Sequence, residues 1–230
     1  MKNTFRVLMT VAVVFGINES SFAQKDKKAF QGTITYNISY KGENLTPAQK
    51  AQLPASVVET IKDCKTKTET AAGILTITSI TDGTAKSATM LIDIGDNKFA
   101  LKQTEADINK KQADEPKLTV NITQETKVIS GFTCKKAIVT TTLEDGTVNN
   151  DTLYFTEELG CKDINFSSGY KDIPGKILQY TVYNTEMQFS TFYTVKEIKK
   201  SKISDNIFLI PIDYKETTEE ELNKMFGGDE

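Results

Sequence analysis

The sequence predicts a mostly β protein: a single curved antiparallel sheet, a meander resembling a half-barrel. One or two short helices cover its concave face, and a short helix follows at the C-terminus. Three observations predict this fold class. Threonine, which suits the solvated side of a strand, occurs 29 times after residue 23. Apolar and polar residues alternate over residues 33–40, the period of a half-buried strand. Turn dipeptides such as Asp82-Gly83 separate short strand-like segments, as in a meander.

The N-terminal segment has the pattern of a secretory signal peptide. Lys2 and Arg6 give a positive start, residues 7–15 are apolar, and Ser21-Phe22-Ala23 is a small-x-small cleavage pattern. The apolar run is shorter than the roughly 20 residues that span a bilayer. We therefore expect cleavage after Ala23, so that 1–23 is a signal peptide and 24–230 a single β-rich domain, periplasmic or secreted. The alternative is an N-terminal helix that stays attached.

The first strand is predicted over residues 30–40. Ile34, Tyr36, Ile38 and Tyr40 point to one side, and threonine, asparagine and serine point to the other. Further strands are expected between turn residues, at 64–70, 74–80, 85–94, 98–104, 117–123, 135–143, 149–156, 177–183, 186–198 and 207–210.

Turn chemistry also predicts how two hairpins align. A two-residue turn at Asp82-Gly83 would place Ile80 opposite Ala85. The turn at Asp145-Gly146 would place Ile138 opposite Leu153. A further turn is expected at Asn184-Thr185.

Two segments are predicted to be helical. Thr46, Pro47 and Gln49 form a capping box with proline at the first helical position, and apolar residues continue at four-residue spacing to Ile61, with Pro54 dividing the stretch. Residues 217–226 are predicted to form a second short helix, for which Thr218 and Glu221 can form the capping box. The polar segment 106–116 is expected to be a loop between strands.

Several strands carry large apolar residues on both faces, as at Ile177-Leu178. A sheet with one solvated face needs only one apolar row. A helix, the curling sheet itself or a ligand must therefore cover the second face, and the early helix is the expected cover.

Composition excludes several function classes. The chain has no histidine and no tryptophan, and its one arginine, Arg6, lies in the expected signal peptide. Histidine-based catalysis and histidine metal sites are therefore absent, and we expect no enzyme, no metal and no cofactor. The net charge of −3 and the lack of an RNP-like aromatic motif argue against a nucleic-acid partner. No segment predicts a transmembrane span.

Three cysteines allow at most one internal bridge. Sequence proximity favours Cys134–Cys161, with Cys64 free. The alternative is three reduced thiols.

The predicted concave face supplies a candidate apolar ligand site. Its expected lining combines aliphatic side chains with tyrosines, which suits a lipid tail or another apolar molecule. The alternative is that these residues form a filled core. The candidates are Tyr36, Ile38, Tyr40, Met90, Ile92, Leu153, Phe155, Leu178, Tyr180, Phe189 and Tyr193.

Three segments carry a family resemblance: residues 129–137, 169–178 and 207–214. In this order they resemble the GLPGLI family and its close unnamed relatives, exported β-rich proteins of Gram-negative bacteria. The naming motif is read here at 173–177, where Pro174 and Gly175 match strictly. The first strand, the early helix and the ending at 208–211 are also similar to periplasmic half-barrel lipoprotein carriers. That similarity implies acyl chains held between sheet and helices.

The sequence thus predicts an exported, non-catalytic binding protein that holds a lipid or another apolar ligand between curved sheet and helix. The alternative is a protein-interaction or envelope-structural module, with an envelope protein as partner, a filled core and no small ligand.

Overall fold

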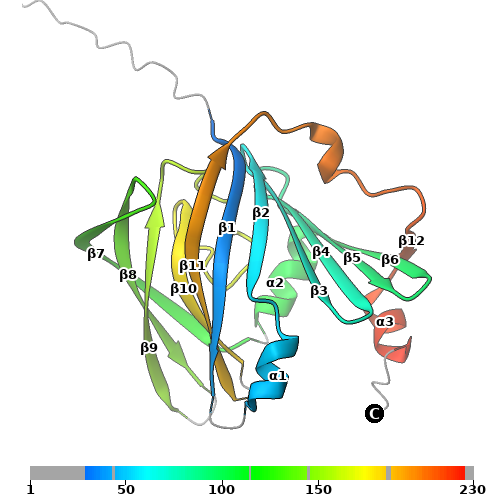
Figure 1. The fold of residues 1–230 in the computed structure, drawn as a ribbon, viewed down its shortest axis with the longest axis horizontal. Helices are drawn as coiled ribbons and strands as arrows, with labels where there is room; N and C mark the ends of the chain where they lie inside the picture. Colours follow the sequence, from blue (N-terminus) through cyan, green and yellow to red (C-terminus); the bar gives the residue numbers. More distant parts are fainter. Residues whose placement is uncertain (1–28, 43–44, 114, 144–145, 185–187, 226–230) are drawn as a thin grey trace, which may run out of the picture.

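A computed structural model describes residues 29–42, 45–113, 115–143, 146–184 and 188–225. The predicted signal peptide lies outside these residues. Within them, twelve strands form one open sheet, in the order β12-β6-β5-β4-β3-β2-β1-β11-β10-β9-β8-β7 (Figure 1). The strands are β1 (Gln31–Lys41), β2 (Ser56–Lys62), β3 (Lys65–Ala72), β4 (Leu75–Asp82), β5 (Ser87–Ile94), β6 (Asn97–Gln103), β7 (Lys117–Ile129), β8 (Phe132–Thr142), β9 (Val148–Thr156), β10 (Lys176–Asn184), β11 (Phe189–Lys200) and β12 (Lys215–Thr217).

Strand pairing follows the predicted meander. All neighbouring strands are antiparallel except β12, which runs parallel to β6. The first strand, β1, lies in the interior of the sheet, between β2 and β11. The predicted fold class, a mostly β protein with one curved open sheet and short helices, is confirmed.

The early helix is shorter than predicted. Helix α1 (Pro47–Gln52) has the expected capping box, in which Thr46 Oγ1 accepts from the Gln49 N–H at 3.3 Å. It ends before Pro54 and buries no residue, so it does not supply the interior cover. The prediction of helix up to Ile61 is wrong. Val57 and Ile61 lie on the same face of β2. The pairing of β2 with β1 favours the strand over the helix for these residues.

The segment predicted as a polar loop at 106–116 contains helix α2 (Glu105–Ala113). Thr104 and Asp107 cap it reciprocally: the Thr104 N–H donates to Asp107 Oδ2 at 2.8 Å, and the Asp107 N–H donates to Thr104 Oγ1 at 3.3 Å. Ile108 is buried against Ala88 and Phe166. The C-terminal helix α3 (Glu219–Met225) begins with the predicted Thr218–Glu221 capping box.

Both predicted hairpin alignments are wrong. Asp82 pairs with Ser87, so Ile80 lies opposite Thr89. The Asp82 carboxylate accepts from the Thr84 and Ala85 N–H groups at 2.9 and 3.0 Å, which holds a longer loop than a two-residue turn. At the other hairpin Leu153 lies opposite Ala137, not Ile138. The shift arises because Thr142 pairs with Val148 across a longer connection.

The segment after β11 forms no strand at 207–210. A 3₁₀ turn, η1 (Asp205–Phe208), begins there instead. Phe208, Ile210 and Tyr214 then pack on a cluster formed by Ile80, Leu91 and Ala100. The turn predicted at Asn184-Thr185 falls mostly outside the described residues, although Asn184 does pair with Phe189.

The second apolar face is covered largely by the irregular segment 157–175, between β9 and β10 (Figure 1). We call it the covering loop. Its buried Leu159 and Ile164 pack in one core cluster with Ile34, Ile61 and Leu178. Its Ile173 packs in a second cluster. The sequence predicted the early helix as the cover, and that prediction is wrong, because α1 buries no residue. The loop takes its place, and it escaped prediction because its apolar residues follow neither strand nor helix spacing.

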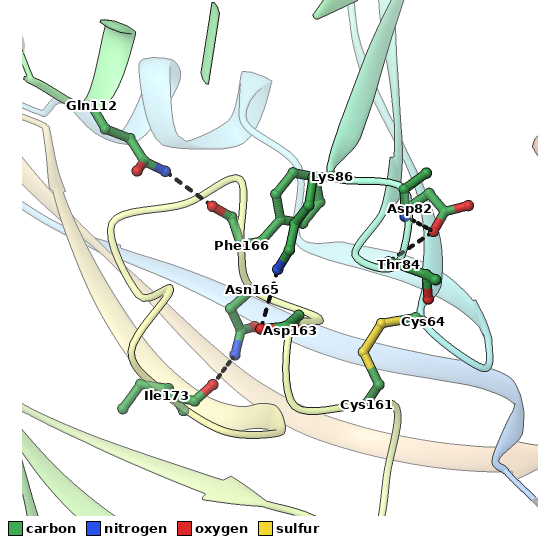
Figure 2. A network of polar contacts seen from close by, with 11 residues as sticks. Cys64, Asp82, Thr84, Lys86, Gln112, Cys161, Asp163, Asn165, Phe166 and Ile173 are labelled. Carbon is green, nitrogen blue, oxygen red and sulfur yellow. Dashed lines mark hydrogen bonds and ion pairs between the residues drawn. A yellow bond between two sulfur atoms is a disulfide. The ribbon is translucent and has the colours of Figure 1, made fainter. Parts of the chain in front are cut away.

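A disulfide ties the covering loop to the turn between β2 and β3. It joins Cys64 to Cys161, with a Cα–Cα distance of 5.1 Å (Figure 2). The prediction of a Cys134–Cys161 bridge is therefore wrong. Cys134 is a free buried thiol on β8. The loop carries Cys161 across the interior to the other half of the sheet, so proximity in sequence misled the pairing.

Polar contacts fix the covering loop at further points (Figure 2). Lys86 Nζ lies 3.2 Å from Asp163 Oδ1. The Gln112 side-chain amide, on α2, donates to the Phe166 carbonyl at 3.2 Å. The buried Asn165 amide donates to the carbonyls of Ile173 and Gly175 at 2.9 and 2.7 Å. The loop is thus held by both sheet and helix.

Candidate functional site

The predicted lining residues meet first in a tyrosine cluster on β1, β10 and β11. Ile38 lies opposite Tyr193, which in turn lies opposite Tyr180. Residues directly opposite share one face of a sheet. The rings of Tyr180 and Tyr193 stack with centroids 4.6 Å apart, and Tyr36 meets Tyr180 edge to face at 6.3 Å. Strand register therefore gathers these side chains as the alternation predicted.

A cavity of about 240 Å³ lies over this cluster. We call it the tyrosine cavity. Five predicted residues line it, together with Pro54, Glu59 and Lys176: Tyr36, Ile38, Tyr40, Tyr180 and Tyr193. Tyr40 closes one side by donating its hydroxyl to the Pro54 carbonyl at 2.7 Å.

The polar wall of the tyrosine cavity is an ion pair. Lys176 Nζ lies 2.6 Å from Glu59 Oε2, and both side chains are largely buried. The Tyr36 hydroxyl donates to the Ile177 carbonyl at 2.8 Å. Burial, and then the negative charge of Glu59, raise the pKa of Tyr36, so this phenol stays protonated. The wall satisfies its own charges and offers none to a ligand.

The other predicted residues do not line the tyrosine cavity. Leu153, Phe155 and Leu178 are fully buried core residues. Phe189 is buried with its ring edge to face against Tyr40 at 5.9 Å. Met90 and Ile92 lie on β5, separated from β1 by β2, β3 and β4. At roughly 4.8 Å per strand spacing, they are too distant to share a small ligand with Tyr36.

A larger cavity of about 510 Å³ lies at the ends of β7, β8, β9 and β10, against the covering loop. We call it the end cavity. Its apolar and aromatic lining comes from Leu118, Val139, Leu143, Tyr170, Val182 and Tyr183. Val182 and Tyr183 are 39% and 48% exposed, so apolar surface is open to solvent at its mouth. None of the residues predicted from the sequence lines it.

Tyr170 and Tyr180 form the wall between the two cavities. Tyr170 lines the end cavity and Tyr180 the tyrosine cavity, and their rings meet edge to face at 6.0 Å. The Tyr170 hydroxyl donates to the Thr181 carbonyl at 3.0 Å. Burial, and then the charge of Asp151, raise the pKa of Tyr170 to about 12. The wall is therefore neutral at physiological pH.

Asp151 is the one half-buried charged side chain among the described residues that line the end cavity. It lies on β9 opposite the buried Val139. Its side chain has no hydrogen bond or ion pair with any described residue, and burial raises its pKa. The position of Asp151 could have been predicted from the sequence. Asp151, Leu153 and Phe155 occupy every second position of one strand and so share one face, which places a carboxylate in an apolar row.

Across the residues described, no three cysteine, aspartate or glutamate side chains gather in a way that could hold a metal ion. Nor does any helix in the described ranges have the length and apolar character needed to cross a membrane.

No protein-family model matches the chain, and no curated protein matches it either. The resemblance to the GLPGLI family stays a prediction.

Proposed function

We propose that the protein is an exported, non-catalytic binding protein that holds a lipid or another apolar molecule in the end cavity. The supporting observation is the cavity itself, about 510 Å³ in volume. This lies within the roughly 300–1,000 Å³ typical of small-molecule sites. Its walls combine aliphatic side chains and two tyrosines with polar side chains from Glu115, Thr141, Asn149, Asp151 and Thr181. Apolar surface for the body of a ligand, beside polar groups that fix its orientation, is the usual design of such sites.

The covering loop supports the same proposal. Disulfide, ion pair and amide contacts fix it in place, so the wall that Tyr170 contributes is preformed. A preformed wall lowers the ordering cost of binding. The tyrosine cavity is smaller and its charges are already paired, so it serves better as a support than as the main site.

The first experiment asks whether the protein carries a ligand. The full chain, with its own N-terminal segment, is expressed in a Gram-negative host, purified without detergent, and extracted with organic solvent for mass spectrometry. We expect near-stoichiometric lipid or a similar apolar compound. Intact mass on the same sample tests cleavage after Ala23, and cell fractionation tests export.

A matched pair of variants localises the site. Val182→Trp puts an indole at the mouth of the end cavity, and we expect it to lose bound ligand at least tenfold. Val128→Trp makes the same change at a 69% exposed position on β7 that lines neither cavity, and should keep its ligand. Equal occupancy in both folded variants would contradict binding in the end cavity.

A second function remains favoured by one observation. Leu153, Phe155 and Leu178, three of the predicted lining residues, are fully buried in the core. A filled interior over this part of the sheet is what an envelope-structural or protein-interaction module needs. If the purified protein holds no extractable molecule and binds no amphiphile, this second function is the one to pursue.

A further inference from the structure

Among the residues that the structure describes, the charged side chains that line the end cavity are all acidic. They are Asp151 and Glu115, and no described lysine lines the cavity. Glu115 is exposed at the rim, whereas Asp151 is half-buried on β9. In a chain with nearly balanced charge, a cavity that places a carboxylate inside and no cation beside it has a specific electrostatic preference.

Asp151 is unusual because nothing in the described part of the protein compensates it. Its neighbour across the strand is the buried Val139, and its charge acts on the Tyr170 phenol, whose hydroxyl is already committed to the Thr181 carbonyl. Asp151 is only half-buried, but taking a carboxylate even partly out of water without a partner costs free energy. By contrast, Glu59 is paired with Lys176 in the neighbouring tyrosine cavity.

Aromatic rings complete the environment. Tyr170 and Tyr183 line the same cavity as Asp151. Aromatic faces attract organic cations, most strongly where water is excluded. A carboxylate with tyrosines, next to aliphatic walls, is complementary to a positively charged head on an apolar body.

We infer that the ligand of the end cavity is a cationic amphiphile, with an ammonium head against Asp151 and an apolar chain against Leu118, Val139 and Val182. This inference rests on the proposed function and names its ligand class. The head neutralises the uncompensated carboxylate, and the chain buries the exposed apolar mouth. A fatty-acid carboxylate would be repelled at the same position.

Four probes built on a ten-carbon chain test the inference: decylamine, decyltrimethylammonium, 1-decanol and decanoate. Each is titrated at pH 7 below its micellar concentration, with affinity measured by calorimetry. The two cations should bind at least tenfold tighter than decanol, and decanoate weakest. Tighter binding of decylamine than of decyltrimethylammonium would identify a hydrogen-bonding primary ammonium, and the reverse order a cation held by the tyrosines.

Asp151→Asn is the decisive variant. It should lose the preference for cations, so that the four probes bind it with similar affinities. Asp96→Asn, in the exposed turn between β5 and β6, removes the same charge away from both cavities and should bind like wild type. Circular dichroism and melting temperature confirm that both variants are folded.

The possible failures are distinguishable. If decanol and decanoate bind wild type as tightly as the cations, the ligand-class inference is wrong while the proposed function stands. If Asp151→Asn keeps the full cation preference, Asp151 is not the counter-ion. If none of the four probes binds, the proposed function itself fails.

Discussion

Glu59 and Lys176 form an ion pair at 2.6 Å in the interior of the sheet, although 117 positions separate them in sequence. Side-chain exposures of 11% and 12% mean that neither charge is well solvated. Removing one partner leaves the other charge buried and unpaired, which typically costs 3–5 kcal/mol of folding stability. We expect Lys176→Met to lower the free energy of unfolding by about 3 kcal/mol in urea titrations. Glu59→Gln with Lys176→Met should recover most of that loss, because no charge is then left unpaired. A double variant as unstable as the single one would contradict this.

The Cys64–Cys161 disulfide closes a loop of 97 residues. Loop-closure entropy predicts a stabilisation of about 4.7 kcal/mol for a loop of this length. Cys64→Ser with Cys161→Ser should lose about that much stability, while Cys134→Ala should leave the bridge intact. Thiol titration is the direct check: one thiol after denaturation without reductant, and three with it. Burial raises the pKa of Cys134, so this thiol should react slowly in the native protein.

The raised pKa of Asp151 predicts an unusual pH dependence of folding stability. Burial raises its pKa in the folded protein above the value near 3.9 of the unfolded chain. Folding therefore disfavours the charged form of Asp151. The resulting loss of folding stability has its largest value at neutral pH, where the carboxylate is charged in both the folded and the unfolded chain. It disappears as the pH falls through the folded pKa towards the unfolded value. Without ligand, Asp151→Asn should have a higher melting temperature than wild type at pH 7. This difference in melting temperature should disappear in acid. The other ionisable groups among the described residues that line the cavity are Glu115, Tyr170 and Tyr183. Glu115→Gln is therefore the control and should show no such difference in melting temperature.

Asn165 is predicted to couple loop order to ligand binding. Its amide satisfies two carbonyls, at Ile173 and Gly175, close to the position where the loop enters β10. Asn165→Ala leaves both carbonyls without this donor and should cost about 2 kcal/mol. Hydrogen exchange should accelerate within the covering loop more than in β1 and β11. Ligand affinity should also fall, because Tyr170 belongs to the same loop. Uniform acceleration over the whole sheet would argue against a local role.

Local periodicity explains which parts of the fold could be predicted. The row Tyr36, Ile38 and Tyr40 follows from alternation alone, and the structure keeps these residues on one face beside Tyr193. Helix α3 and the start of α1 follow from capping boxes, which are also local. The end of α1 was misjudged because Val57 and Ile61 fit helical and strand spacing alike, and only pairing with β1 selects the strand.

The parts that could not be predicted depend on distant contacts. The Cys64–Cys161 pairing and the covering loop depend on how the chain crosses the interior. Helix α2 was missed because it buries a single residue, Ile108, and so has no apolar stripe. Hairpin alignment depends on loop length, which the Asp82 side chain sets through two backbone N–H groups. The end cavity was missed because its lining comes from four strand ends and a loop.

The interior position of β1 has a consequence for how the protein folds. The first strand synthesised pairs along its whole length with β11, where Ile34 meets Ile198. Pairing between distant segments loses loop-closure entropy before the strand contacts contribute any stabilisation, and this makes folding slow. The sheet that the structure describes cannot be completed until nearly all of its strands have left the ribosome. For the export proposed above, this delay is the property that keeps the polypeptide unfolded for translocation.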